Sequence, residues 1–314
     1  MQTIKSLITG GAGFIGSNLV QRLLDNNEEV ICLDNLFTGR KKNIDKFLKN
    51  PKFRYIHHDV VDPFDIDIHI DKIWHLACPA SPINYQLDPI KTARTSFLGT
   101  YNMLELANYK RAKLLLASTS EIYGDPKIHP QSENYHGNVN TTGIRSCYDE
   151  GKRIAETLCF DYWRTKNLQI SIVRIFNTYG PGMQPDDGRV ISNLIVQALE
   201  GKDLTIYGDG EQTRSFCYVD DLIDGIILAM DSEYQMPINI GNPKEISINQ
   251  LSEIIKTKIN KDLKCIYKVL PEDDPTQRCP VIELAKKKLG WQATVDLEEG
   301  LEKTIEYFKK TYVS

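Results

Sequence analysis

A glycine-rich turn between two apolar segments constrains the fold of this chain more than any other feature. Residues 4–9 form a short apolar run, as in a strand that is buried on both faces of a parallel sheet. Residues 14–24 repeat apolar side chains at helical spacing. The turn between them reads Gly10-Gly11-Ala12-Gly13-Phe14-Ile15-Gly16. This order of strand, turn and helix predicts the start of a Rossmann fold.

The glycines of this turn have separate roles in a site for a dinucleotide. Gly10 and Gly11 permit a tight turn, Gly13 lets the backbone approach a pyrophosphate, and Gly16 lets the helix pack on the strand. The helix N-terminus offers unpaired N–H groups to the anion. The cofactor contacts expected here are Gly10, Gly13, Phe14, Ile15 and Gly16.

Asp34 indicates which dinucleotide binds. It ends the apolar run 30–33, at the spacing where such folds place an acid on the adenosine ribose. A carboxylate there repels a 2′-phosphate, so NAD is favoured over NADP. Arg40 and Lys41 follow closely and could bind such a phosphate, and a helix cap is the structural alternative for Asp34. The further contacts expected in this loop are Asn35, Phe37, Thr38 and Gly39.

Apolar runs and helical stretches continue to alternate along the chain. The runs are 53–56, 72–76, 113–117 and 169–175, and the helical stretches are 90–109 and 147–166. This alternation predicts an α/β protein with a doubly wound parallel sheet. Asp59 and Val60, after the third run, and Leu76 and Ala77, after the fourth, fall at the ligand side of that sheet and are expected to touch adenine and ribose.

Composition narrows the class of protein. The chain has 314 residues, of which 41% are hydrophobic and 25% charged, as in a globular protein with one large core and a smaller domain. A net charge of −4 disfavours nucleic acid as a partner. The first predicted strand begins close to Met1 and no long apolar stretch occurs, so we expect a cytoplasmic protein without a membrane partner.

Cysteine and histidine spacing gives no sign of a metal site. The seven cysteines lack CxxC spacing, which suits reduced thiols, and we favour a packing role for Cys147 over a nucleophilic one. His57 and His58 are neighbours on a predicted strand and therefore point to opposite faces. We expect no metal, and structural roles for the other histidines.

The pattern Tyr-x-x-x-Lys occurs four times, so position must choose among the matches. They are Tyr109/Lys113, Tyr123/Lys127, Tyr148/Lys152 and Tyr162/Lys166. Only Tyr148 and Lys152 begin a predicted helix near the cofactor. A protonated Lys152 beside Tyr148 is expected to lower the tyrosine pKa and make a base for a sugar hydroxyl, while also holding the nicotinamide ribose. A solvated helix pair is the structural alternative.

Several longer stretches resemble the extended short-chain dehydrogenase/reductase family of nucleotide-sugar enzymes, and among them the UDP-glucuronate decarboxylases. They are residues 34–41, 75–82, 117–125, 147–156, 174–178, 187–190 and 212–214. Thr119-Ser120-Glu121 divides the subfamilies, because related 4,6-dehydratases carry an Asp between Thr and Glu. Serine is a poor proton donor, so the triplet argues against elimination.

The resemblance implies an activity and a set of roles. UDP-glucuronate would be oxidised at C4 with NAD, lose CO₂ and be reduced again to UDP-xylose. The residues that the resemblance makes catalytic are Thr119, Glu121, Tyr148, Lys152 and Arg278. Those that it places on the substrate are Ser81, Tyr85, Asn177, Arg189, Tyr207, Gln212 and Arg214. A surface ion pair is the structural alternative for Arg278.

The resemblance also implies the domain organisation. Residues 1–178 would form the NAD-binding domain, with return elements near 216–241, and residues 179–314 a smaller, interleaved nucleotide-sugar domain. A homodimer would form through the helices at 90–109 and 147–166. The alternatives that remain open are a nucleotide-sugar 4-epimerase, a 4,6-dehydratase and a non-enzymatic NAD-binding protein.

Overall fold

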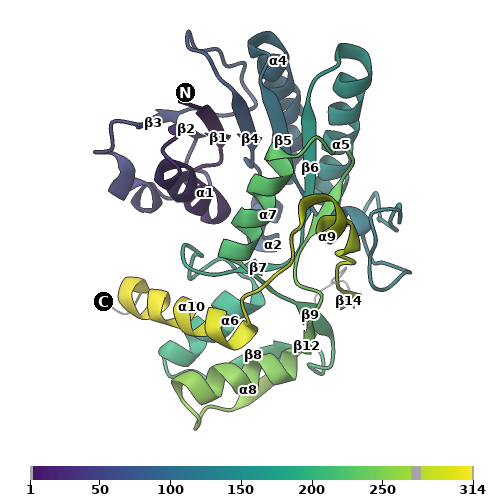
Figure 1. Cartoon of the computed structure of the whole chain (residues 1–314). Coiled ribbons are helices and arrows are strands. Elements are labelled where there is room, and N and C mark those ends of the chain that lie inside the picture. Colours follow the sequence, from purple (N-terminus) through teal and green to yellow (C-terminus); the bar gives the residue numbers. More distant parts are fainter. Residues whose placement is uncertain (1–2, 270–276, 313–314) are drawn as a thin grey trace.

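A seven-stranded parallel sheet forms the centre of the molecule (Figure 1). The computed structural model describes residues 3–269 and 277–312. The strand order is β11-β6-β5-β4-β1-β2-β3. The strands are β1 (Lys5–Thr9), β2 (Glu29–Asp34), β3 (Phe53–His57), β4 (Lys72–His75), β5 (Lys113–Thr119), β6 (Ile170–Ile175) and β11 (Ile238–Ile240). The predicted doubly wound sheet is confirmed, and its order reverses between β1 and β4, where such sheets bind ligands.

Helices cover both faces of this sheet. On one face α1 (Phe14–Asp25) contacts α7 (Val219–Asp231), and on the other α4 (Thr100–Lys110) packs against α5 (Ser146–Lys166). Alternate strand residues supply the two layers. Ile8 belongs to the cluster with α1 and α7, whereas its neighbour Leu7 belongs to the cluster with α4 and α5. Because both faces are covered, the strands are apolar at successive positions.

The helical stretch that the sequence predicts over 90–109 contains one wider turn. It consists of α3 (Pro89–Arg94), a π-helical turn (Thr95–Gly99) and then α4. Gly99 allows a close approach here, since a Cβ on it would lie 2.7 Å from Val60 Cγ2. Apolar spacing predicts a helix but does not distinguish a π turn from a regular one.

The later part of the chain builds a smaller lobe, drawn below the sheet in Figure 1. Its helices are α6 (Val190–Leu199), α8 (Ile248–Ile259) and α10 (Leu297–Tyr312), and its strands are β8 (Leu204–Tyr207), β9 (Thr213–Ser215), β12 (Glu245–Ser247), β13 (Cys265–Lys268) and β14 (Gln277–Arg278). The remaining elements are α2 (Pro82–Leu87), β7 (Thr178–Tyr179), β10 (Cys217–Tyr218), α9 (Glu283–Leu289) and 3-10 turns at Lys41–Asn43, Asp45–Phe47 and Ser120–Tyr123. The domain boundary between residues 178 and 179 stays a prediction.

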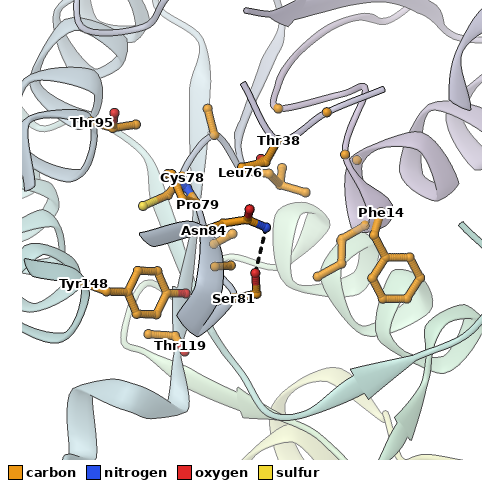
Figure 2. Close-up of a pocket in the computed structure, with 18 of the residues that line it drawn as sticks. Phe14, Thr38, Leu76, Cys78, Pro79, Ser81, Asn84, Thr95, Thr119 and Tyr148 are labelled. Carbon is orange, nitrogen blue, oxygen red and sulfur yellow. Dashed lines mark hydrogen bonds between the residues drawn. The ribbon is translucent and has the colours of Figure 1, made fainter. Parts of the chain in front are cut away.

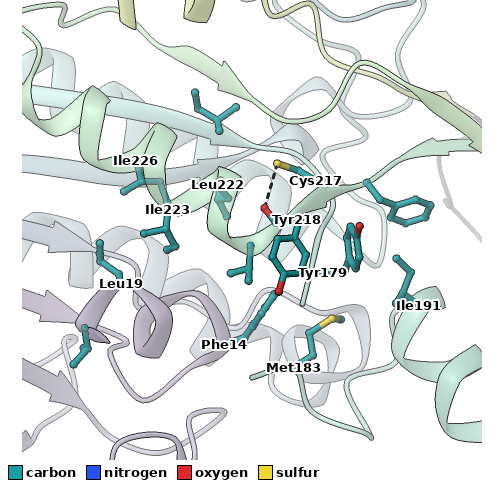
Figure 3. Packing of buried hydrophobic residues seen from close by; sticks show 14 of the residues in the cluster. Phe14, Leu19, Tyr179, Met183, Ile191, Cys217, Tyr218, Leu222, Ile223 and Ile226 are labelled. Carbon is teal, nitrogen blue, oxygen red and sulfur yellow. Dashed lines mark hydrogen bonds between the residues drawn. The ribbon is translucent and has the colours of Figure 1, made fainter. Parts of the chain in front are cut away.

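One apolar cluster joins the sheet to the smaller lobe (Figure 3). Phe14 on α1 and Leu222 on α7 belong to it, together with Tyr218, Met183 and Ile191 from the later part of the chain. The smaller lobe is therefore packed against the sheet through shared core side chains. Within residues 3–269 and 277–312, no helix combines the length and apolarity that crossing a bilayer requires.

Candidate active site

A pocket lies at the carboxyl ends of the central strands, where the strand order reverses (Figure 2). Every residue that the sequence predicts for the cofactor lines it. These are Gly10, Gly13, Phe14, Ile15, Gly16, Asp34, Asn35, Phe37, Thr38, Gly39, Asp59, Val60, Leu76, Ala77, Tyr148 and Lys152. The strand ends bring these side chains together because parallel strands finish at one edge of a sheet.

The glycine turn leaves bare backbone at the start of α1. Gly10 has a φ of +71°, which favours glycine, and its N–H donates to Leu33 O at 2.9 Å. Gly13 is the N-cap of α1 and supplies no side-chain cap. The first N–H groups of the helix are therefore left without a side-chain acceptor, as an anion site requires.

We expect Gly16→Ala to weaken the NAD binding that the sequence predicts. A Cβ on Gly16 would lie 2.1 Å from Gly10 O and 2.8 Å from Gly11 Cα, so the backbone of the turn must move. We predict a loss of NAD affinity of about 100-fold, near 2.7 kcal/mol, in calorimetric titration. Gly201→Ala is the control for strain at a glycine: Gly201 has a φ of +68°, which disfavours alanine, but a Cβ on it meets nothing within 4 Å and the residue does not line the pocket. Wild-type affinity in Gly16→Ala would contradict the placement of the pyrophosphate.

Asp34 is held at the edge of the pocket by two backbone groups. Ala12 N donates to its Oδ2 at 2.9 Å and Leu36 N to its Oδ1 at 2.8 Å. Burial nevertheless raises the pKa of Asp34, with those two hydrogen bonds opposing the shift. Arg40, which the sequence offers as a phosphate ligand, pairs with Asp186.

Tyr148 and Lys152 lie on one face of α5, beside the end of β5. Lys152 Nζ donates to Ala117 O at 2.9 Å and lies 6.0 Å from the centre of the Tyr148 ring. Figure 2 shows the Tyr148 hydroxyl directed toward the pocket, next to Thr119. The Tyr148–Lys152 pair and Thr119 are thus brought together from two elements, α5 and β5.

The predicted lowering of the Tyr148 pKa is wrong for the protein by itself. Burial raises the pKa of Tyr148 well above its ordinary value, and the charges of Cys78, Glu121 and Asp149 add to this, while a hydrogen bond with Thr119 opposes it. The lysine ammonium is 6.0 Å from the ring centre and binds a carbonyl, so it does not offset the burial. The sequence showed the pair but not the depth at which it lies.

Glu121 is held by two arginines from distant parts of the chain. Arg145 Nη2 lies 2.6 Å and Arg278 Nη2 3.2 Å from Glu121 Oε2. Burial disfavours the charged carboxylate, but Arg278 and Arg145 outweigh it and hold the pKa of Glu121 below its ordinary value. Arg145 was not predicted as a site residue, and its one signal in the sequence is its place just before the helix that carries Tyr148.

Arg278 is buried, so the alternative of a surface ion pair is wrong. It is 2% exposed, and its guanidinium also donates to Ser120 O and, at 3.0 Å, to Gly124 O. The arginine therefore binds both the carboxylate and the backbone of the Thr119-Ser120-Glu121 segment.

Asp149 is a buried carboxyl group close enough to Glu121 and its arginines to feel their charges. Its Oδ1 has no hydrogen-bond partner among the described residues. Burial and the charge of Glu121 raise its pKa from 3.8 to about 7, with Arg145 and Arg278 opposing the shift. The neutral carboxyl group is therefore favoured up to about neutral pH.

Asp149→Asn tests this pKa through stability. A raised pKa means that the stability contributed by the neutral group is fully present below about 3.8 and is lost as pH rises through about 7. The melting temperature of Asp149→Asn, relative to wild type, is therefore expected to rise between these pH values and then stay level. The exposed Asp161→Asn on the same helix is the control. A difference that shrinks with pH would refute the shift.

The predicted substrate residues fall into three groups. Ser81, Asn177 and Arg189 line the pocket, although Arg189 pairs there with Asp187. Tyr85 lies behind the pocket. Its ring stacks on the Tyr148 ring, with the ring centres 5.1 Å apart and an angle of 2° between the ring planes. The Tyr85 hydroxyl has no hydrogen-bond partner among the described residues.

The third group lies on the smaller lobe, outside the lining of this pocket. Tyr207 is 43% exposed, and Gln212 Nε2 donates to its carbonyl. Arg214 lies opposite Arg278 where β9 pairs with β14, and its charge also lowers the pKa of Glu121. Other residues line the pocket without having been predicted as cofactor or substrate contacts, among them Cys78, Pro79, Asn84, Lys91, Thr95, Gln184 and Asp187.

Other polar groups suit structural roles. His75 bonds Thr9 and Thr100 through its two ring nitrogens, and burial lowers its pKa to about 3. All seven cysteines are free, and burial raises the pKa of Cys147. His57 contacts Tyr55 on its own strand.

A parallel sheet in this order, with a glycine turn at its reversal and a Tyr-x-x-x-Lys pair opposite Thr119, defines an extended short-chain dehydrogenase/reductase. A family model described as GDP-mannose 4,6 dehydratase matches residues 7–304. The chain is 54% identical over 307 residues to UDP-glucuronic acid decarboxylase 3 of Arabidopsis thaliana, covering 98% of this chain and 89% of that protein. It is 52% identical over 304 residues to UDP-glucuronic acid decarboxylase 1 of Xenopus tropicalis, covering 97% and 72%.

A solved structure adds a second comparison. UDP-glucuronic acid 4-epimerase from Bacillus cereus, in complex with UDP-glucuronic acid and NAD, is similar with a TM-score of 0.88 and 31% identity, covering 98% of this chain and 100% of that one. The chain belongs to the UDP-glucuronic acid decarboxylase family of extended short-chain dehydrogenases/reductases.

Proposed function

We propose that the protein is a UDP-glucuronate decarboxylase that uses bound NAD to convert UDP-glucuronate to UDP-xylose. The observation that carries the proposal is the Glu121 carboxylate held by Arg278 and Arg145 beside Tyr148, in a chain more than half identical to decarboxylases. A similar solved structure contains both UDP-glucuronic acid and NAD.

The described residues fit NAD. The uncapped start of α1 would bind the pyrophosphate, and Asp34 would face the adenosine ribose, where a 2′-phosphate would be repelled. Lys152 would hold the nicotinamide ribose. When bound, NAD⁺ supplies an acceptor for the C4 hydride and returns that hydride at the end of the cycle.

Tyr148 would be the base for the C4 hydroxyl group, because the positive charge of NAD⁺, when bound, would oppose the burial that raises the tyrosine pKa. Loss of that proton with the hydride leaves a ketone β to the C6 carboxylate, and such an acid loses CO₂ once its enolate is stabilised. Thr119 and Tyr148 donate hydrogen bonds to the developing oxyanion. Glu121, together with Arg278, acts near C5 and the carboxylate. Protonation at C5 then gives the pentose skeleton.

Ser120 separates this reaction from its nearest rival. A 4,6-dehydratase needs an acid at that position to protonate a departing hydroxyl, and serine is a poor donor near neutral pH. Ser120 is also 2% exposed, and its carbonyl accepts from Arg278. A 4-epimerase shares the first oxidation, so it is the other alternative.

The substrate would span both lobes. Ser81, Tyr85 and Asn177 would contact the sugar, and Arg189, Tyr207, Gln212 and Arg214 the UDP group, since paired guanidinium donors suit a diphosphate. In this scheme residues 1–178 hold the cofactor and residues 179–314 the nucleotide sugar, with 216–241 returning to the sheet.

A homodimer through α3, α4 and α5 is part of the proposal. These helices and the π-helical turn between α3 and α4 expose the apolar side chains Ile90, Phe97, Tyr101, Tyr109 and Ile154. Such a set of exposed apolar residues suits burial against a second copy. A monomer in sedimentation at micromolar concentration would exclude it.

Incubation with UDP-glucuronate and NAD tests the function. We expect CO₂ and a UDP-pentose, with little net NADH. A UDP-uronic acid of unchanged mass but inverted at C4 would indicate an epimerase. Conversion only of neutral UDP-hexoses would indicate a different enzyme, and no reaction with retained NAD binding would indicate the non-enzymatic alternative.

A further inference from the structure

Gln131 joins the segment that carries Glu121 to the segment that carries Arg278. It is fully buried. Its Oε1 accepts a hydrogen bond from Cys279 N at 2.9 Å, and its own N–H donates to Cys279 O at 2.8 Å. Val281 N donates to Gln131 O at 2.8 Å. These three bonds fix the backbone directly after Arg278.

Asn239 holds Gln131 from the other side. It is also fully buried, at the edge strand β11. Its Nδ2 donates to Gln131 O at 3.0 Å, and its Oδ1 accepts from Tyr123 OH at 2.8 Å. Tyr123 follows Glu121 by two residues and accepts a hydrogen bond from Arg174 at 3.0 Å. One buried network therefore reaches both sides of the Glu121–Arg278 ion pair.

The ion pair depends on this backbone placement. Arg278 lies at the end of a two-residue strand, and its guanidinium must reach Glu121, Ser120 O and Gly124 O together. The Arg278 carbonyl accepts a hydrogen bond from Ser215 Oγ that is long, at 3.4 Å. A displacement of residues 279–281 would therefore move the guanidinium away from the carboxylate.

We propose that Gln131 is a positioning residue for the reaction, and that its amide sets the geometry of the Glu121–Arg278 pair. This inference rests on the proposed function, in which that pair acts at C5 and the carboxylate after Tyr148 has acted at C4. Loss of the amide should slow the steps after oxidation and leave the oxidation itself intact.

Gln131→Met tests this, because methionine has a similar length and no amide. With the full-length protein, NAD and UDP-glucuronate, we expect NADH to form in the first turnover within about twofold of the wild-type rate. Formation of UDP-pentose should fall about tenfold or more, so that NADH absorbance accumulates. A variant that was only less stable would lose both rates in proportion.

Two further variants isolate the effect. Gln197→Met is the matched control, since Gln197 Oε1 likewise accepts from a backbone group, Thr205 N, at 2.9 Å, but far along the chain in the smaller lobe. It should keep the wild-type ratio of the two rates. In an Arg278→Lys background, Gln131→Met should cause little further loss, because both changes act on one interaction.

Wild-type pentose formation by a folded Gln131→Met protein would overturn the proposal, as would equal loss of both rates or full additivity with Arg278→Lys. If Gln131→Met does not fold, Asn239→Ala takes its place, because it removes the hydrogen bond from Asn239 Nδ2 to Gln131 O that holds Gln131. The ratio of the NADH rate to the UDP-pentose rate then decides. Failure of the proposed function is distinguishable, because the wild-type protein itself would then release no CO₂.

Discussion

Tyr148→Phe is expected to lower turnover of UDP-glucuronate by about 10²- to 10⁴-fold, the usual contribution of a positioned acid or base. The change removes only the hydroxyl group. The ring stack on Tyr85, at 5.1 Å, is retained, so the fold and NAD binding should survive. The measurement is the rate of CO₂ release under saturating substrate, with NAD affinity determined in parallel.

Tyr162→Phe is the matched control for this prediction. Tyr162 lies on the same helix, also four residues before a lysine, but its hydroxyl contacts Glu105 away from the pocket. It should retain full turnover. Activity of Tyr148→Phe within about tenfold of wild type would show that another group takes the C4 proton.

Arg278→Met should lower turnover about 100-fold. It should also destabilise the fold by about 3 kcal/mol, which is the lower end of the cost of breaking a buried ion pair, because Arg145 still pairs with Glu121. Removing the positive charge raises the pKa of Glu121. The carboxylate contributes stability above its unfolded pKa and loses it as pH falls through its folded pKa. The acid limb of the stability profile should therefore move to higher pH.

Arg153→Met is the control for the loss of a guanidinium group that binds this loop; the Arg153 side chain is 37% exposed. Arg153 Nη1 donates to Ile122 O at 2.9 Å and to His136 O at 2.8 Å, so it binds the same loop without contacting Glu121. The acid limb of the stability profile of Arg153→Met should match that of the wild-type protein. An unchanged limb in Arg278→Met as well would mean that Arg145 alone sets the charge of Glu121.

Local patterns in the sequence are sufficient to predict the sheet, and they also predict which residues line the pocket at its edge. Apolar runs and helical spacing are readable within a dozen residues, and parallel strands then bring Gly10, Asp34, Asp59 and Leu76 to one edge without further information. The π turn at Thr95–Gly99 escaped prediction, since it leaves the apolar spacing nearly unchanged.

The ion pairs and pKa values of the site depend on contacts between residues that are distant in the sequence. Arg145 and Arg278 reach one carboxylate oxygen of Glu121 from positions 24 and 157 residues away. The one local signal for Arg145 is its place just before α5, and nothing local in the sequence marks Gln131 as part of this site. The pKa of Tyr148 was predicted with the wrong sign for the same reason, because burial is a property of the assembled fold.

UDP-glucuronate that carries deuterium at C4 tests the central claim most directly. If a hydride is removed from C4 and returned, mass and NMR spectra should show a UDP-pentose that retains the deuterium at C4, formed over many turnovers on substoichiometric NAD. In D₂O, unlabelled substrate should gain one deuterium at C5. A pentose that loses the C4 label to solvent, or a uronic acid recovered unchanged, would contradict the account.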